Sequence, residues 1–380
     1  MPGPLEGFRV IELGGIGPAP FCGMVLGDLG AEVIRISRVS DVHPHFNNPV
    51  LDRGRRQIAV DLKSSTGVDL VKRLIASSDA VIEGFRPGVM ERLGFVPGEL
   101  RQANPKLVVG RMTGYGQDGP MSQEAGHDIN YISQAGVLGS IGRAGDKPVA
   151  PLNLVGDFGG GGMLLAVGVL AGILSASKSG KGQDIDAAMV DGAALLMAMM
   201  YGFSAQGRWN GSARGHNLFD GGMPYYDTYE TKDGKYVAVG AIEPQFYKAL
   251  VEGLGLSDVL DLKTQLDQST WPHIAEVLTE TFKTKTRDEW AVELAGTDTC
   301  VTAVYSMDEA PNSPHVTSRG VFVKDEAGVT HPAPAPRFSA TPLASPRKPH
   351  DPAADTDAVL TDLGLSETEI KQLHADGVIA

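Results

Sequence analysis

The chain has 380 residues, of which 42% are hydrophobic and 21% are charged, and its formal net charge at pH 7 is −13. This length exceeds the usual size of a single hydrophobic core, so two domains are expected. The acidic balance argues against nucleic acid as the main partner, because phosphate binding needs a positive face, and no uninterrupted apolar run of about 18 residues predicts a membrane span.

The first part of the chain alternates strand and helix patterns. Residues 8–13 predict a buried strand, residues 21–29 a helix and residues 33–36 a second strand. This βαβ order predicts a parallel sheet of Rossmann type. The alternation continues to about residue 115, with further strands expected at 58–60, 80–82 and 107–110 and a helix at 66–77.

The loop between the first strand and helix resembles a dinucleotide-binding turn but departs from it. Pro18 and Pro20 lack the N–H groups that hold a pyrophosphate at a helix start. At the end of the second strand, Arg38 stands where a nicotinamide enzyme places an acid for the ribose hydroxyls. A cation there suits a phosphorylated ribose, which NADP has at the 2′ position and coenzyme A at the 3′ position. An NADP-dependent oxidoreductase fits Arg38 but not the prolines.

Three ionisable side chains lie in apolar or glycine-rich stretches: His127, Asp157 and Glu243. Such settings are hard to solvate, which moves a carboxyl pKa toward the range useful for proton transfer. Each residue also has a structural interpretation. His127 can be an ordinary structural histidine, Asp157 can cap a helix beginning at Phe158, and Glu243 can start a helix that follows it.

The second half of the chain predicts buried helices and then a smaller unit. Helices are expected at 163–174 and 193–202, and the second of these carries Met197, Met199 and Met200. Methionines at this spacing are either core filler or an adaptable wall for an acyl chain. Residues 225–239 predict a β-hairpin, and helices are expected at about 245–254, 272–283 and 286–295. Proline-rich stretches at 332–336 and 346–349 predict extended connectors that return along the first domain.

The remaining sequence features concern the compartment and the chain end. Cys22 and Cys300 lie far apart without the spacing of a metal site or a C-x-x-C pair, and the nine histidines are scattered. No signal-peptide pattern follows Met1, so a cytoplasmic location is expected. Residues 351–380 hold seven acidic residues against one lysine, which predicts a solvated helical tail.

Motifs along nearly the whole chain resemble the α-methylacyl-CoA racemases of the family III CoA-transferase (CaiB/BaiF) superfamily. The resemblance implies an α/β fold with a Rossmann-like large domain and a smaller α+β domain in an interlaced homodimer. It places the large, CoA-binding domain at 1–190 plus 320–380, a linker at 191–224 and the small domain at 225–319. The motifs that carry the resemblance are the loop at 14–20, Asp61-Leu62-Lys63, residues 85–89, 125–131 and 151–160, Gly180-Lys181-Gly182-Gln183, Asp220-Gly221-Gly222 and residues 240–247.

The same resemblance implies a racemase or epimerase that interconverts (2R)- and (2S)-2-methylacyl-CoA thioesters through an enolate, without a metal or redox cofactor. His127 and Asp157 exchange the proton at C2 from opposite faces, and Glu243 orients His127. Backbone N–H groups of Asp157 and its neighbours are the expected donors to the enolate oxygen. The implied CoA-binding residues are Arg38, Ala59, Val60, Asp61, Leu62, Arg86, Arg92, Gly126, Asp128, Ile129, Asn130 and Tyr131.

An alternative within the superfamily is a CoA-transferase. There the residue matching Asp157 attacks the thioester to form an anhydride. Such transfer requires neither His127 nor Glu243, whereas racemisation needs a second base, so their joint presence favours the racemase. The residues leave the preferred acyl group open, as well as the physiological direction and the role of Met197–Met200.

Overall fold

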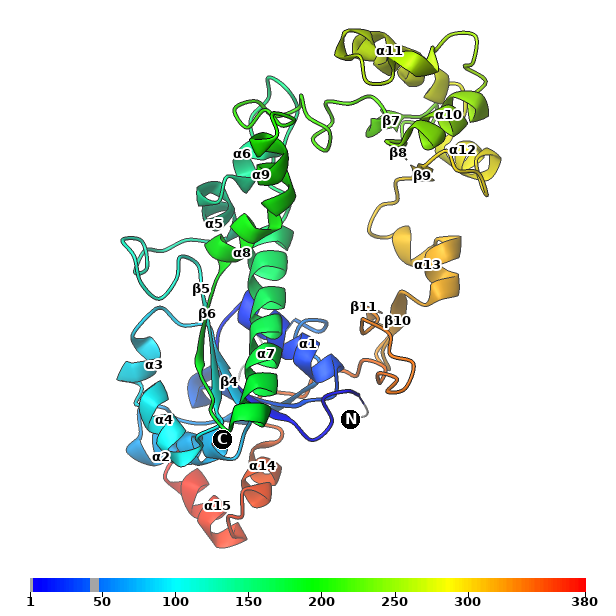
Figure 1. The fold of residues 1–380 in the computed structure, drawn as a ribbon. Helices are drawn as coiled ribbons and strands as arrows, with labels where there is room; N and C mark the ends of the chain where they lie inside the picture. Colours follow the sequence, from blue (N-terminus) through cyan, green and yellow to red (C-terminus); the bar gives the residue numbers. More distant parts are fainter. Residues whose placement is uncertain (1–2, 42–47) are drawn as a thin grey trace. The chain divides into compact units, whose positions relative to one another are not determined.

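The computed structural model describes residues 3–41 and 48–380, and the chain divides into two compact units (Figure 1). The first unit comprises Met1–Ala135, Pro151–Leu196 and His315–Ala380, and the second comprises Gly136–Ala150 and Met197–Pro314. The short segment Gly136–Ala150 thus groups with the second unit, and the stretch expected as a linker contains helix α9 (Ala198–Ala205). The predicted domain boundaries at 190, 224 and 319 stay a prediction for the assembled protein.

The first unit is built on a six-stranded parallel sheet with the order β3-β2-β1-β4-β5-β6. The order reverses between β1 and β4, as in the Rossmann fold, so the predicted sheet type is confirmed. The strands are β1 (Arg9–Leu13), β2 (Glu32–Ser37), β3 (Arg55–Ala59), β4 (Ala80–Glu83), β5 (Val108–Thr113) and β6 (Asp184–Ala188).

Helices cover both faces of this sheet because alternate strand residues point to opposite sides. On one face, Ile11 and Ile34 pack with Leu74 of α2 (Ser65–Ala76). On the other, Val10 and Val33 pack with residues of α1 (Pro18–Asp28) and α7 (Leu164–Ser179). The other elements of this unit or its border are η1 (Val39–Asp41), α3 (Val89–Arg92), α4 (Pro97–Ala103), α5 (Asp128–Gln134), the π-helix η2 (Leu154–Met163), α8 (Met189–Leu196), α13 (Pro314–Arg319), β10 (Phe322–Lys324) and β11 (Thr330–Pro332).

The acidic tail is not a solvated appendage, so that prediction was wrong. Helices α14 (Thr356–Asp362) and α15 (Glu367–Ala375) bury Leu360 and Ile370 in the core of the first unit. The last residues also join the sheet edge, where the Asp61 N–H donates to the Val378 carbonyl at 2.8 Å. Both helices are amphipathic: their acidic side chains face water while their apolar side chains pack against the core. The net charge of the segment alone therefore did not predict its burial.

One helical stretch, Leu154–Ser179, is long and apolar enough to cross a membrane by length and composition alone. It consists of η2 followed by α7, and it contains Asp157 and four consecutive glycines. Leu165 and Val169 of α7 belong to the core that covers the sheet. Core helices of globular units meet the same length and hydropathy test.

The second unit has a three-stranded antiparallel sheet, β7-β8-β9, covered by helices. The predicted hairpin is β7 (Tyr226–Glu230) paired with β8 (Tyr236–Gly240), and the three predicted helices are α10 (Pro244–Gly253), α11 (Trp271–Phe282) and α12 (Arg287–Glu293). Tyr225, Tyr247, Trp271 and Phe282 form much of its core. Its further elements are α6 (Val137–Ser140), α9, β9 (Val301–Ala303), η3 (Leu262–Thr264), η4 (Gln268–Thr270) and η5 (Ala310–Asn312).

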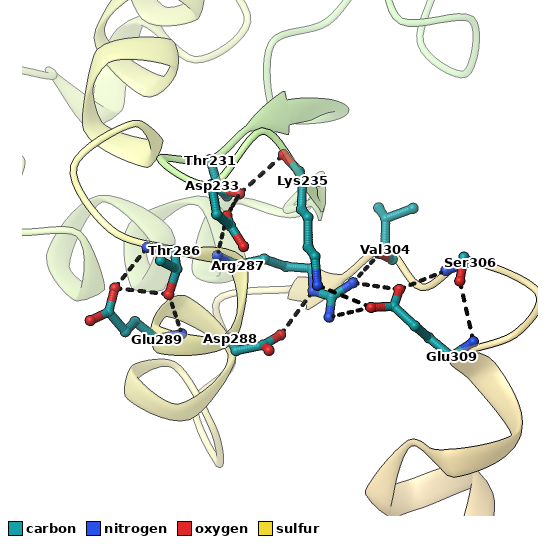
Figure 2. A network of polar contacts seen from close by, with 10 residues as sticks. All are labelled: Thr231, Asp233, Lys235, Thr286, Arg287, Asp288, Glu289, Val304, Ser306 and Glu309. Atoms are coloured by element: carbon teal, nitrogen blue, oxygen red, sulfur yellow. Dashed lines mark hydrogen bonds and ion pairs between the residues drawn. The ribbon is translucent and has the colours of Figure 1, made fainter.

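A polar network centred on Arg287 joins three parts of the second unit (Figure 2). The buried guanidinium donates two hydrogen bonds to Glu309, at 2.8 and 3.1 Å, and one to the Val304 carbonyl. The Arg287 N–H donates to Asp233 in the hairpin turn. The bonds from Arg287 are the largest cause that holds the pKa of Glu309 well below its usual range. The network fixes the segment after β9 onto α12 and the hairpin.

Candidate active site

The first unit has a cavity of about 710 Å³ at the carboxyl ends of β1, β4 and β5. In open α/β sheets this edge, at the point where strand order reverses, is the usual ligand site. The loop after β1 contributes Gly17, the loop after β4 contributes Arg86, and the loop after β5 contributes Tyr115. His127 and Asp157 line the same cavity. The fold therefore brings together two of the three residues predicted to be catalytic.

His127 lies at the N-cap of α5, and its side chain is exposed to the cavity rather than buried in the core. The Asn130 side-chain oxygen accepts a hydrogen bond from the His127 N–H at 3.1 Å, which fixes the entry of the chain into the helix. As the N-cap residue, His127 has a structural place at the start of α5, but its side chain is not held in the core. An exposed imidazole in a cavity is available for proton transfer.

Asp157 does not cap a helix, so the alternative interpretation of this residue was wrong. It lies inside η2, where the backbone is already helical, and it is half-buried. Short π-helical segments occur frequently at functional sites. A glycine in the loop after β1 allows close approach to η2: a methyl group at Gly17 would lie 3.3 Å from an Asp157 carboxylate oxygen. The carboxyl thus faces the loop after β1 at one wall of the cavity.

This environment raises the pKa of Asp157 above its ordinary value, and removal of the carboxyl from water is the largest cause. The hydrogen bond that Asn153 donates to it at 3.0 Å lowers the pKa, the charge of Asp128 raises it, and His127 lowers it. The net direction brings the carboxyl closer to the range in which it can exchange protons with an imidazole.

The Asp157 N–H is not free to bind an enolate, which corrects the expected set of donors. It donates to the carboxylate of Asp128 at 2.7 Å. Asp128, predicted to bind CoA, is itself buried, and its side chain bonds the backbone of η2. The sequence reasoning missed this contact because it joins residues 29 positions apart, through a carboxylate that looked like part of a loop. A contact between Asp128 and CoA stays a prediction.

Tyr131 forms part of the cavity wall. Its hydroxyl donates to the Gly126 carbonyl, and its ring meets that of Tyr115 edge-on at 4.9 Å. A methyl group at Gly114 or Gly126 would collide with the Tyr131 ring, at 2.1 and 2.8 Å. Burial is the largest cause that raises the pKa of Tyr131 to about 12, so the phenol stays protonated. Tyr115 had no signal in the sequence beyond its position after a predicted strand.

The residues predicted to bind CoA are spread over more than this cavity. Arg86, Gly126, Asn130 and Tyr131 line it. Ile129 is exposed on α5. Arg38, just after β2, and Arg92, at the end of α3, are also exposed, and neither forms an ion pair with a residue that the structure describes. Ala59 and Val60 are buried, and Asp61 and Leu62 are partly buried beside them. The burial of Ala59 and Val60 includes their backbone, whose N–H groups bond Thr356 and Ser37, so their contact with CoA stays a prediction.

Glu243 belongs to the second unit, where it is the exposed N-cap residue of α10. Pro244 follows at the first helical position, as is common at helix starts, but the Glu243 side chain makes no capping hydrogen bond. Partial burial, followed by the charges of Glu243 and Asp298, raises the pKa of the Cys300 thiol. The expected contact between Glu243 and His127 stays a prediction.

The second unit has a separate cavity of about 720 Å³, lined by Met197, Met200, Trp209 and Phe219 among others. The helix expected at 193–202 is in fact two helices, α8 and α9, which break at Met197. Two of the three methionines therefore face a cavity instead of a packed core. Across residues 3–41 and 48–380, no group of three or more His, Cys, Asp or Glu side chains is arranged to hold a metal ion.

The chain is similar to known proteins over nearly its whole length. Residues 5–358 match CoA-transferase family III, and the chain belongs to that family. It is 45% identical to the alpha-methylacyl-CoA racemase of Mus musculus over 99% of this chain and 97% of the relative, and 42% identical, with the same coverage, to that of Homo sapiens. The crystal structure of a CAIB/BAIF family protein from Brucella suis superimposes with a TM-score of 0.80 at 25% identity, over 96% of this chain and 100% of that one.

The hydrogen bond from Asn153 predicts how the Asp157 carboxyl responds to mutation. Because this bond stabilises the charged form, Asn153→Ala raises the pKa of Asp157 further. Carbon-13 NMR of the aspartate carboxyls, with Asp157→Asn used to assign the signal, measures the shift. Asn104→Ala is the control: it removes a hydrogen bond that the Asn104 side-chain amide donates to the Ser78 carbonyl, and it leaves the Asp157 signal in place. An unchanged or lower pKa in Asn153→Ala would contradict the assigned contact.

Proposed function

We propose that the chain interconverts the 2R and 2S forms of 2-methylacyl-CoA thioesters by removing and returning the proton at C2. The observation that carries the proposal is the shared cavity of His127 and Asp157, reached from two different elements. The full-length similarity to proteins named alpha-methylacyl-CoA racemase supports the same activity.

The chemistry requires two groups that exchange the roles of acid and base. When one removes the proton from one face of C2, the other must carry a proton to the opposite face. A neutral imidazole and a protonated carboxyl form one competent state, and an imidazolium and a carboxylate form the other. The raised pKa of Asp157 brings these two states closer in free energy. Racemisation in both directions then needs no additional proton carrier.

The thioester activates C2 because the carbonyl oxygen takes up charge as the proton leaves. Donors aimed at that oxygen are each typically worth about 3 kcal/mol of barrier. With the Asp157 N–H engaged by Asp128, we assign this role to other groups on the cavity wall. The chemistry as proposed uses no metal and no redox cofactor, since the carbonyl already stabilises the carbanion as an enolate.

We assign the CoA portion to the exposed cations around the carboxyl edge of the sheet. Arg86 lines the cavity, while Arg38 and Arg92 are exposed on neighbouring segments. Their charge suits the phosphates of CoA in a chain whose overall charge is −13. The methyl-branched acyl chain needs an adaptable apolar wall, and Met197 and Met200 supply that chemistry.

We further propose an interlaced homodimer, in which Glu243 of the partner subunit orients His127. An apolar strip in the first unit supports a partner: Leu154, Met163, Val167, Leu174 and Leu195 are all exposed along η2, α7 and α8. Exposed apolar patches of this kind mark interaction surfaces. A cytoplasmic location is also proposed, and the two unpaired cysteines, Cys22 and Cys300, accord with a reducing compartment.

Deuterium incorporation separates the racemase from the transferase. Either pure enantiomer of a 2-methylacyl-CoA, incubated in deuterated water without an acceptor acid, should gain deuterium at C2 and drift to an equal mixture. A transferase that uses Asp157 as nucleophile forms an anhydride and needs a carboxylate acceptor. CoA exchange that depends on an acceptor and leaves C2 protium and configuration untouched would overturn the proposal.

Arg38 offers a test of the CoA assignment. Arg38→Ala should raise KM roughly fivefold with little change in kcat, because an exposed ion pair is worth up to about 1 kcal/mol and is made equally in the ground and transition states. The effect should vanish on short N-acetylcysteamine thioesters, which lack the adenosine phosphate. Arg101→Ala, which removes a partly exposed cation paired with Asp184 on another part of the unit, is the control. An equal loss on both substrate types speaks against the assignment.

A further inference from the structure

Asp128 is a buried carboxylate beside the cavity, and its side chain bonds a backbone amide. It is the first residue of α5, next to His127, and its side chain is only 5% exposed. One carboxylate oxygen accepts the Asp157 N–H at 2.7 Å. The other oxygen is buried and has no hydrogen-bond partner among the residues that the structure describes. Burying a carboxylate with only one hydrogen bond costs free energy. The bond to the Asp157 N–H is the interaction that offsets this cost.

The backbone of η2 is shaped to reach this carboxylate. A methyl group at Gly156 would lie 2.5 Å from the bonded Asp128 oxygen and 3.1 Å from the Ile132 side chain. Only a glycine at this position lets η2 come close enough for the Asp157 N–H to bond Asp128. The contact therefore depends on two separate features, a buried acid on α5 and a glycine preceding Asp157.

Asp128 follows His127 directly in the chain, so its contact with η2 bears on the position of the imidazole. His127 and Asp128 are adjacent, so the carboxylate that holds the Asp157 amide is tied directly to the residue that bears the imidazole. One hydrogen bond thus links the two elements that carry the proposed proton carriers. Two-sided proton transfer needs both groups within reach of the same carbon, and a misplacement of about 1 Å can cost roughly 100-fold in rate.

We propose that Asp128 is a positioning residue that fixes the separation of His127 and Asp157 across the cavity. The inference rests on the proposed function, and it differs from the CoA-binding role that resemblance implied for this residue. A buried side chain turned toward η2 does not contact the substrate. Its effect is on the placement of the two proton carriers, and so on turnover more than on substrate binding.

Kinetics of two substitutions separate these roles. Asp128→Ala removes the acceptor and should lower kcat about 10- to 100-fold in both directions, with KM changed less than about threefold. Asp128→Asn keeps an oxygen that can accept the Asp157 N–H and should retain a clearly higher kcat than Asp128→Ala. Asp186→Ala is the matched control, because it removes a carboxylate that accepts the Gln117 N–H at 2.9 Å outside the cavity.

Amide exchange gives a readout that does not depend on turnover. In Asp128→Ala the Asp157 amide should exchange with deuterated water at least about tenfold faster, since it loses its acceptor, while Asp186→Ala leaves that amide unchanged. If circular dichroism shows that Asp128→Ala does not fold, Asp128→Ser takes its place, because its shorter side chain does not reach the amide.

The outcomes distinguish this inference from the proposed function. Absence of C2 exchange in the unchanged enzyme contradicts the function, and the amide exchange of Asp157 then still decides whether Asp128 holds η2. Unchanged amide exchange in Asp128→Ala overturns the inference. A raised KM with normal kcat, or an equal loss of kcat in Asp186→Ala, overturns it as well.

Discussion

Close backbone contact around η2 is the constraint on which the candidate site depends. Side chains at its glycines would collide with neighbouring main chain: a methyl group at Gly160 would lie 2.6 Å from the Ala193 nitrogen, and one at Gly162 would lie 2.6 Å from the Pro18 carbonyl. The same approach packs Phe158 against Phe21 of α1, with ring centroids 4.7 Å apart and the ring planes tilted by 35°. Because η2 is held this tightly, Asp157 faces the cavity from a rigid helix instead of a loop.

The chemistry follows from this packing. Dense surroundings remove water from the Asp157 carboxyl and raise its pKa, while the opening of the cavity leaves His127 accessible at the start of α5. Two groups of different chemical type thereby become comparable proton carriers. The second unit is organised by its own aromatic core and by the Arg287 network, and it holds Glu243 at the exposed start of a helix.

Periodic patterns predicted most of the fold, because buried strands and amphipathic helices have a signal within a few residues. The βαβ opening, the hairpin and the helices of the second unit were all found this way. What failed depended on contacts across the chain. The freedom of the Asp157 N–H and the solvated tail were both wrong, because Asp128 and the sheet edge at Asp61 act on them from distant positions. The interpretation of Asp157 as a cap failed because η2 begins three residues earlier, at Leu154. No local pattern distinguishes a carboxylate that binds a ligand from one, such as Asp128, that binds another backbone amide.

The central claim is that His127 and Asp157 exchange the C2 proton from opposite faces. Variants that keep only one of these two residues test it most directly. In deuterated water, Asp157→Asn should exchange the C2 proton of only the enantiomer that presents it to His127, and His127→Ala should exchange only that of the other. Neither variant should convert one enantiomer into the other at an appreciable rate, because each lacks one proton carrier. Exchange of the same enantiomer by both variants, or near-normal racemisation by either, would contradict the account.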